Sequence, residues 1–135
     1  MSTDVRTHLR ISPALCGTPE ELRPGFARVV FEATLEMAAD DRELVHGGFT
    51  FGLADYAAML AVNEPTVVLA SATTKFLAPV IAGERLEAEA TVDRTEGRKH
   101  WVKVTVRRGR GGAAVMEGEF MAVVPATHIL DVKKA

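Results

Sequence analysis

The chain has 135 residues, of which 47% are hydrophobic and 25% are charged, so its size and composition are those of one ordinary domain. Its 16 Lys and Arg against 18 Asp and Glu give a formal net charge of -2, which argues against a dedicated binder of nucleic acid or of a membrane surface. The single cysteine, Cys16, excludes an internal disulfide and a cysteine-based zinc site, and without an apolar leader or a membrane span we expect a cytoplasmic protein.

The first 27 residues contain three prolines and two glycines and predict a lead-in segment, with one helical turn that begins at Thr18-Pro19. Apolar and polar side chains then alternate from Arg28 to Met37, which predicts a half-buried strand. This strand opens the single domain that we expect over residues 28–126, and residues 127–135 are predicted to form a C-terminal tail.

An acidic loop leads into the segment from Gly48 to Val62, and we predict that this segment is a helix. Its only polar side chains are those of Thr50, Asp55 and Tyr56, so the helix is apolar nearly all round. Such a helix is expected to be buried nearly all round. A strongly curved sheet wrapped around it satisfies that demand better than a flat one.

Four strands are predicted after the helix, at residues 66–78, 85–93, 102–107 and 113–124. The first is rich in Val, Thr, Leu and Phe, and we expect it to be buried for much of its length. Alternation in the later strands is typical of an antiparallel sheet with one face in solvent, so the helix must cover the other face. The predicted fold class is α+β, in the chain order strand, helix, four strands.

A carboxylate inside the apolar helix requires an explanation, because an unpaired buried charge costs several kcal/mol. Asp55 lies at a solvent contact, at an interface or in an inert ion pair, or else it serves a chemical function. The start of the same helix favours the last interpretation, since Gly47-Gly48 exposes backbone N–H groups at the positive end of the helix dipole. Such donors can form an oxyanion hole.

Spacing along the helix separates these two features. Gly47 and Asp55 are eight positions apart, which corresponds to roughly 12 Å along the axis. One substrate carbonyl cannot contact both within one chain. We therefore predict a homodimer in which the helix start of one subunit faces Asp55 of the partner subunit, giving two composite sites.

The same residues resemble a known family. His46-Gly47-Gly48 followed by Leu53-Ala54-Asp55 resembles the HGG...LAD signature of hotdog-fold acyl-CoA thioesterases of the phenylacetate-degradation type. The stretch from Phe76 to Val80, followed by Gly83-Glu84, is similar to the family's passage into its third strand. The resemblance covers residues 28 to 124.

The resemblance implies a hotdog fold, dimers that often pair into tetramers, and hydrolysis of acyl-CoA thioesters. It also implies that Asp55 acts as general base or nucleophile, that the Gly47 N–H polarises the thioester carbonyl, and that His46 orients groups near the site. We expect no metal, and no cofactor beyond the CoA of the substrate. Relatives often carry Asn six residues before the His, where this chain has Asp40 and therefore lacks that amide.

Four further residues are predicted to bind substrate. Gly48 supplies a second backbone amide, and Phe49 and Tyr56 make an apolar pocket plausible. Relatives often have Asn in the strand before the proline, where Thr73 offers a hydroxyl. His8, His100 and His128 are scattered in the sequence and show no metal-ligand spacing.

Two questions remain open from the sequence. Seven basic residues lie between Arg94 and Arg110 with one acid, and they form either a charged hairpin edge or contacts to the phosphates of CoA, where Trp101 could stack on the adenine. The leading function is an acyl-CoA thioesterase. The alternatives are a module that binds acyl-CoA without hydrolysing it and a hotdog enoyl-CoA hydratase or dehydratase.

Overall fold

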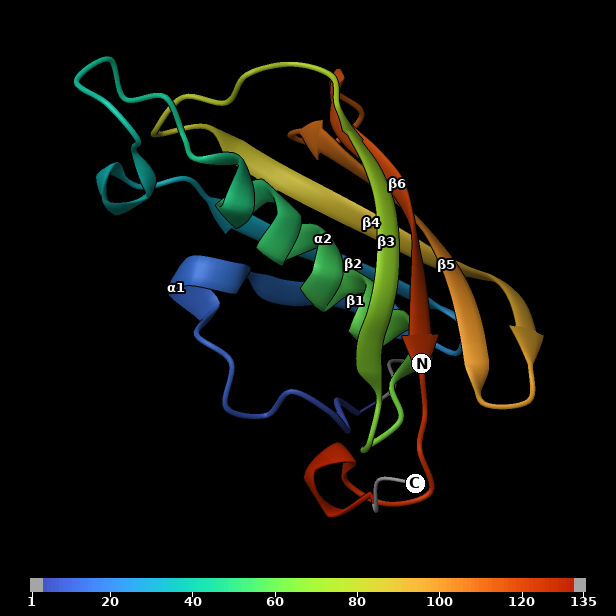
Figure 1. Ribbon diagram of the computed structural model, residues 1–135. Coiled ribbons are helices and arrows are strands. Elements are labelled where there is room, and N and C mark those ends of the chain that lie inside the picture. The colour runs from blue at the N-terminus through green and yellow to red at the C-terminus, as the bar shows by residue number, and fades with distance from the viewer. Residues whose placement is uncertain (1–3, 133–135) are drawn as a thin grey trace.

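The computed structural model describes residues 4–132, which form a six-stranded antiparallel sheet curved around one long helix (Figure 1). The spatial order of the strands is β1-β2-β4-β5-β6-β3. The strands are β1 (Thr18–Arg23), β2 (Phe26–Glu32), β3 (Val68–Phe76), β4 (Arg85–Glu96), β5 (Lys99–Arg108) and β6 (Ala114–Val123). The helices are α1 (Pro13–Cys16) and α2 (Gly47–Val62), with 3-10 helices η1 (Leu35–Met37) and η2 (Ile129–Asp131). This confirms the predicted α+β class.

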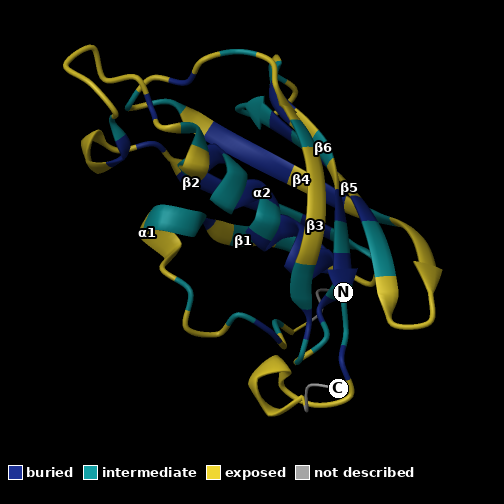
Figure 2. Ribbon diagram, viewed as in Figure 1, coloured by how far each residue is buried: buried dark blue, intermediate teal, exposed yellow. Residues whose placement is uncertain are grey.

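The long helix α2 packs into the concave face of the sheet, where buried residues of the helix and of the strands meet (Figure 2). Leu53, Ala57 and Leu60 are fully buried, in agreement with the apolar pattern of the segment. The helix ends at Asn63, which adopts a left-handed conformation and donates its N–H to the Met59 carbonyl at 2.8 Å. No helix within residues 4–132 is long and apolar enough to cross a lipid bilayer.

The prediction of a helical turn at Thr18-Pro19 is wrong, because these residues begin strand β1. β1 pairs with β2 along its length, and Leu22 reaches the core at 5% exposure. Sheet pairing and burial therefore outweigh the local helix signal. Pro19 is accommodated because β1 is an edge strand with a register shift beside it. The chain order becomes two strands, a helix and four strands, and the short helix α1 lies upstream.

The predicted strand from Arg28 to Met37 is also shorter than expected. β2 ends at Glu32, where its partner β4 begins at Arg85, so no strand is available to continue the pairing. The alternation continues into η1, where Leu35 is exposed and Met37 is buried. Periodicity alone did not distinguish strand from short helix here.

Strand β3 lies at the open edge of the sheet and is mostly exposed, which corrects the prediction that it is buried (Figure 2). It pairs with β6 on one side, and no strand within residues 4–132 pairs with its other side. Its composition of Val, Thr, Leu and Phe predicts a strand but not its place in the sheet. The strands predicted at residues 85–93, 102–107 and 113–124 are confirmed as β4, β5 and β6.

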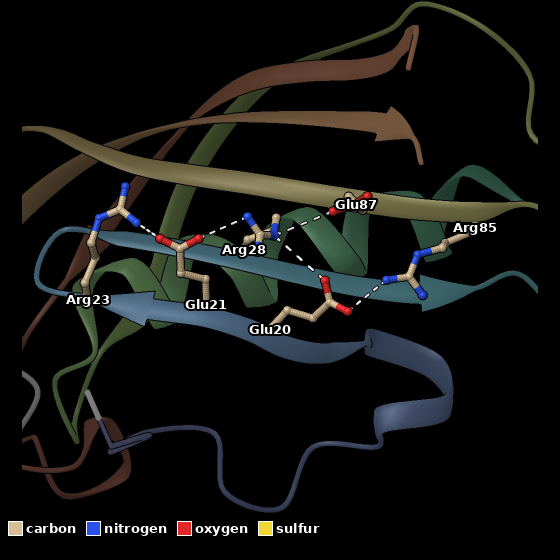
Figure 3. Close-up of polar contacts among 6 residues, drawn as sticks. All are labelled: Glu20, Glu21, Arg23, Arg28, Arg85 and Glu87. Atoms are coloured by element: carbon tan, nitrogen blue, oxygen red, sulfur yellow. Dashed lines mark hydrogen bonds and ion pairs between the residues drawn. The ribbon is translucent and has the colours of Figure 1, made fainter. Parts of the chain in front are cut away.

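A network of ion pairs fastens β1 to the rest of the sheet (Figure 3). Arg28 on β2 lies 3.0 Å from Glu21 on β1 and 3.6 Å from Glu87 on β4. Glu20 lies 3.8 Å from the same arginine and 2.8 Å from Arg85. Arg28 and Glu87 are mostly buried, so they bridge three strands at a point that water scarcely reaches.

Candidate functional site

The start of α2 presents unpaired backbone donors. His46 is the N-cap, but its side chain makes no capping hydrogen bond. Within the described residues, the N–H groups of Gly47 and Gly48 have no acceptor. Gly47 lines a cavity of about 380 Å³ together with Thr50 and residues of the segment 76–80. This end of the helix can therefore donate to an oxygen that enters the cavity.

Close approach of two aromatic rings explains the two glycines. A Cβ on Gly47 would lie 3.3 Å from the ring of Phe76, and a Cβ on Gly48 would lie 3.0 Å from the ring of His46. The His46 ring also packs edge-on against Phe49, with centroids 6.2 Å apart. His46 and Phe49 thus form one packed group that shapes the helix start.

Asp55 lies near the middle of α2 with one carboxylate oxygen buried and unpartnered. Within residues 4–132, its Oδ1 accepts no hydrogen bond and the side chain forms no salt bridge. Burial raises the pKa of Asp55 to about 6, because the charged form is poorly solvated there. The inert ion pair considered from the sequence is therefore not formed within the described chain.

A second cavity, of about 360 Å³, lies against Asp55 and is built from segments far apart in sequence. The N-terminal segment and η2 come together near the beginning of β3 (Figure 1). The cavity is lined by Thr7, His8, Asp55, Pro65, Thr66, Val67, Val68, Leu69, His128 and Ile129.

His8 and His128 were not predicted at the site, and the structure brings them to the same cavity as Asp55. Long-range contacts that the sequence does not show create this arrangement. Asn63 accepts from the Arg6 N–H and donates to the Asp4 carbonyl, both at 2.8 Å, and so fastens the N-terminal segment to the end of α2. In the sequence, the one available signal of this contact is the polar residue Asn63 at the C-terminus of the helix.

The predicted site residues fall into separate places within one chain. Gly47 and Asp55 line different cavities, as their spacing requires. Tyr56 is buried at 5% exposure and lines a hollow beside α1 instead of the Asp55 cavity. Thr73 lies on the outer face of the sheet beside Lys103 and Glu119, away from both cavities of its own chain.

The basic hairpin also has a defined geometry. The Arg94 guanidinium covers one face of the Trp101 ring at 3.9 Å from its centroid. Glu96, Arg98 and Lys99 line an open hollow next to Trp101. One face of the predicted adenine platform is therefore already occupied.

Comparison with known proteins identifies the family. A sequence model of the family described as thioesterase superfamily matches residues 43–115, which include the helix start and Asp55. The chain belongs to the thioesterase superfamily. The fold is accordingly the hotdog fold, as the resemblance implied.

Solved structures with a similar fold agree with that assignment. The Pyrococcus horikoshii protein PH1136 is 47% identical, with a TM-score of 0.94 over 97% of this chain and 99% of that one. The PaaI protein of the Escherichia coli phenylacetic acid degradation operon is 25% identical, with a TM-score of 0.76 over 84% of this chain and 83% of that one. These likenesses cover the sheet together with the helix.

Curated relatives that contain a similar segment have other names. The methylthioribose-1-phosphate isomerase of Aquifex aeolicus is 48% identical over 120 residues, which are 89% of this chain and 26% of that protein. The transcription factor FapR of Caldanaerobacter subterraneus subsp. tengcongensis is 31% identical over 96 residues, which are 70% of this chain and 46% of that protein. The chain thus spans about a quarter to a half of the length of these relatives.

Proposed function

We propose that the protein is an acyl-CoA thioesterase that acts as a homodimer, with each active site formed between two subunits. The observation that carries this proposal is the course of β3. One end of β3, at Phe76, borders the Gly47 cavity, and its other end, at Val68, borders the Asp55 cavity. The strand therefore links the two half-sites of one chain along its open edge.

Pairing two copies of this edge completes both sites. In an antiparallel arrangement about a two-fold axis near Ala72, Phe76 of one subunit lies opposite Val68 of the partner subunit. The Gly47 cavity of one subunit is then adjacent to the Asp55 cavity of the other. An unpaired edge strand also has free backbone groups that such pairing satisfies.

Exposed apolar side chains gather at the same two places. Five of the large exposed hydrophobic residues within the described chain lie in the segments 35–44 and 76–81, and two of these five line the Gly47 cavity. The other four lie in the two segments that contribute His8 and Ile129 to the Asp55 cavity. The first group is Leu35, Leu44, Phe76, Leu77 and Ile81, and the second is Leu9, Ile129, Leu130 and Val132. Exposed apolar patches on a small domain mark interaction surfaces, and the proposed dimer brings the two groups together.

The chemistry follows from the groups at the two half-sites. The thioester carbonyl oxygen accepts a hydrogen bond from the Gly47 N–H, which stabilises the negative charge that develops on it. Asp55 of the partner subunit, ionised above its pKa of about 6, takes a proton from a water molecule that attacks the carbonyl carbon, or it attacks that carbon itself and forms a mixed anhydride that water then hydrolyses. The C–S bond then breaks, and CoA leaves with the electron pair on sulfur.

A second candidate function is acyl-CoA binding without hydrolysis. It is favoured by the similarity to the transcription factor FapR, whose name describes a regulator and not an enzyme. In a binding module the acyl-CoA remains intact.

Thiol release from a panel of acyl-CoA esters tests the proposal. We expect the wild type to release CoA and Asp55→Asn to lower kcat by about 100-fold or more, because the amide can neither accept a proton nor attack. Asp93→Asn is the matched control, since this aspartate lies on the surface at the β4–β5 side of the sheet and should retain wild-type kcat. No release by the wild type, or equal rates for wild type and Asp55→Asn, would contradict the proposal.

A further inference from the structure

The N-terminal segment holds His8 in an unusual backbone conformation. Its φ of 55° lies in the left-handed region, which residues other than glycine seldom adopt. Such conformations persist where surrounding contacts over-determine them, and they cluster at functional sites. Here the contacts are the two hydrogen bonds between Asn63 and the preceding residues Asp4 and Arg6.

The His8 ring is itself fixed from two sides. The Thr7 hydroxyl lies 2.8 Å from His8 Nδ1, and Thr7 is buried at 3% exposure. On helix α2, the Tyr56 ring lies 6.3 Å from the His8 ring, centroid to centroid. Both the position and the rotation of the imidazole are therefore set before any ligand binds.

One ring nitrogen remains available. Nδ1 is engaged by Thr7, whereas Nε2 has no hydrogen-bond partner within the described residues and is not among their buried unpartnered atoms. It can therefore be reached by water or by a ligand. His8 lines the same cavity as Asp55, and burial lowers the pKa of its ring, so that the imidazole is neutral near pH 7.

The other titratable groups around Asp55 are less suited to assist it. His128 is exposed, and its Nδ1 accepts the Leu130 N–H at 3.0 Å as part of the η2 cap. Cys16 on α1 has the pKa of its thiol raised by burial and then by the Asp55 charge, so it stays protonated. Tyr56 lies beside Asp55 on α2 but faces a different hollow. His8 alone combines a fixed neutral ring with a free nitrogen.

We propose that His8 is a positioning residue that holds the attacking water in the Asp55 cavity. The inference rests on the proposed thioesterase function and adds a residue to its site. The water hydrogen-bonds to His8 Nε2 and to the Asp55 carboxylate, and Asp55 takes its proton as the water oxygen bonds to the acyl carbon. The C–S bond breaks with its electron pair on sulfur, and the proton on Asp55 passes to the thiolate. His8 keeps the same number of protons throughout.

Kinetics of four variants test this role. We expect His8→Leu to lower kcat by about 10-fold to 100-fold with KM changed by less than about 2-fold, because only the orientation of water is lost. His8→Gln should retain most of the activity, since its amide nitrogen reaches the place of Nε2. Thr7→Val, which is isosteric but releases the ring, should fall between wild type and His8→Leu, whereas Thr7→Ser keeps the hydroxyl and should resemble wild type.

His100→Leu is the matched control. His100 on the β4–β5 hairpin also has a threonine partner, with Nδ1 3.2 Å from the Thr95 hydroxyl, but it lies in no cavity with Asp55. Its replacement should leave kcat at the wild-type value.

A second measurement does not depend on activity. Carbon-13 NMR of labelled aspartate follows the titration of Asp55, and loss of the water-mediated hydrogen bond should raise its pKa in His8→Leu above the wild-type value. Equal kcat in wild type and His8→Leu, or an unchanged Asp55 titration, would overturn the inference about His8 while leaving the thioesterase intact. Absence of thiol release by the wild type would instead overturn the proposed function.

Discussion

The burial of Asp55 lowers the stability of the folded chain. Its Oδ1 has no partner within residues 4–132, and the raised pKa shows that the folded chain disfavours its charged form. An asparagine or leucine at this position would avoid that cost. A carboxylate in such a place is typical of a functional group, because active sites accept destabilising residues for the sake of chemistry.

The dependence of stability on pH should report this cost. The Asp55 pKa is about 6 in the folded state and about 3.9 when unfolded, so between these values the folded state binds more protons. Stability therefore falls as pH rises through this window. We predict that the free energy of unfolding of Asp55→Asn exceeds that of wild type by about 1–3 kcal/mol at pH 7.5. This difference in stability should shrink towards pH 4.

Urea unfolding at the two pH values measures this difference, with Asp93→Asn as the control that should show no such pH dependence. Equal stability of Asp55→Asn and wild type at pH 7.5 would mean that Asp55 is solvated or paired in the folded protein.

Gly47 allows the backbone donor to be removed without a change of helix geometry. Proline suits the first helical position, and His46 before it has φ −63° and ψ 131°, which proline accepts in its neighbour. We predict that Gly47→Pro lowers kcat by about 100-fold through loss of the N–H, with little change in melting temperature. Gly47→Ala retains the N–H and places a Cβ near Phe76 as the proline also does, so it is the steric control and should retain most of the rate. A wild-type rate in Gly47→Pro would exclude this amide from the reaction.

The sequence predicts Asp55 and Gly47 because each breaks a local pattern, a charge in an apolar helix and a glycine pair at its start. It does not predict His8, whose place depends on contacts between residues more than 50 positions apart. Tyr56 was predicted as part of an apolar pocket and Thr73 from the resemblance to the family, and both line other hollows of their own chain.

Among the strands, β1 is the one whose attachment to the sheet depends most on ion pairs. Within residues 4–132, only β2 pairs with it, and the buried Arg28–Glu87 pair extends its attachment to β4 (Figure 3). We predict that Arg28→Met lowers the free energy of unfolding by about 3 kcal/mol, because Glu87 would remain buried without a partner. The combined variant Arg28→Met and Glu87→Leu should recover much of this loss, since no buried charge remains.

Chemical denaturation checks both variants. Lys103→Met is the control, because its pair with Asp93 is exposed and should contribute less than about 1 kcal/mol. If Arg28→Met were as stable as wild type, the ion pairs of Arg28 would not hold β1 in place.

At this scale the alternation of β4, β5 and β6 was sufficient to predict them, because each has one apolar and one polar face. β1 escaped prediction because a proline and two adjacent glutamates give it no such alternation. β3 was predicted as a strand, but its exposure follows from its place at the edge, which depends on the order of the whole sheet.

At the scale of the whole molecule, each chain has two cavities at opposite ends of β3, and we propose that each is half of an active site. Gly47 lines one cavity and Asp55 lines the other. Under the proposed function, a working site must therefore combine two chains. The same dimer would bring together the two groups of exposed apolar residues.

A heterodimer with one variant in each chain tests this requirement most directly. Asp55→Asn and Gly47→Pro subunits, co-expressed with different tags, are purified as the mixed dimer, and thiol release from an acyl-CoA that the wild type hydrolyses is measured. Each variant homodimer should be nearly inactive. The mixed dimer should show about half of the wild-type kcat per dimer, because one of its two composite sites joins an intact Gly47 to an intact Asp55 of the partner subunit. A mixed dimer as inactive as its two parents would contradict the shared site.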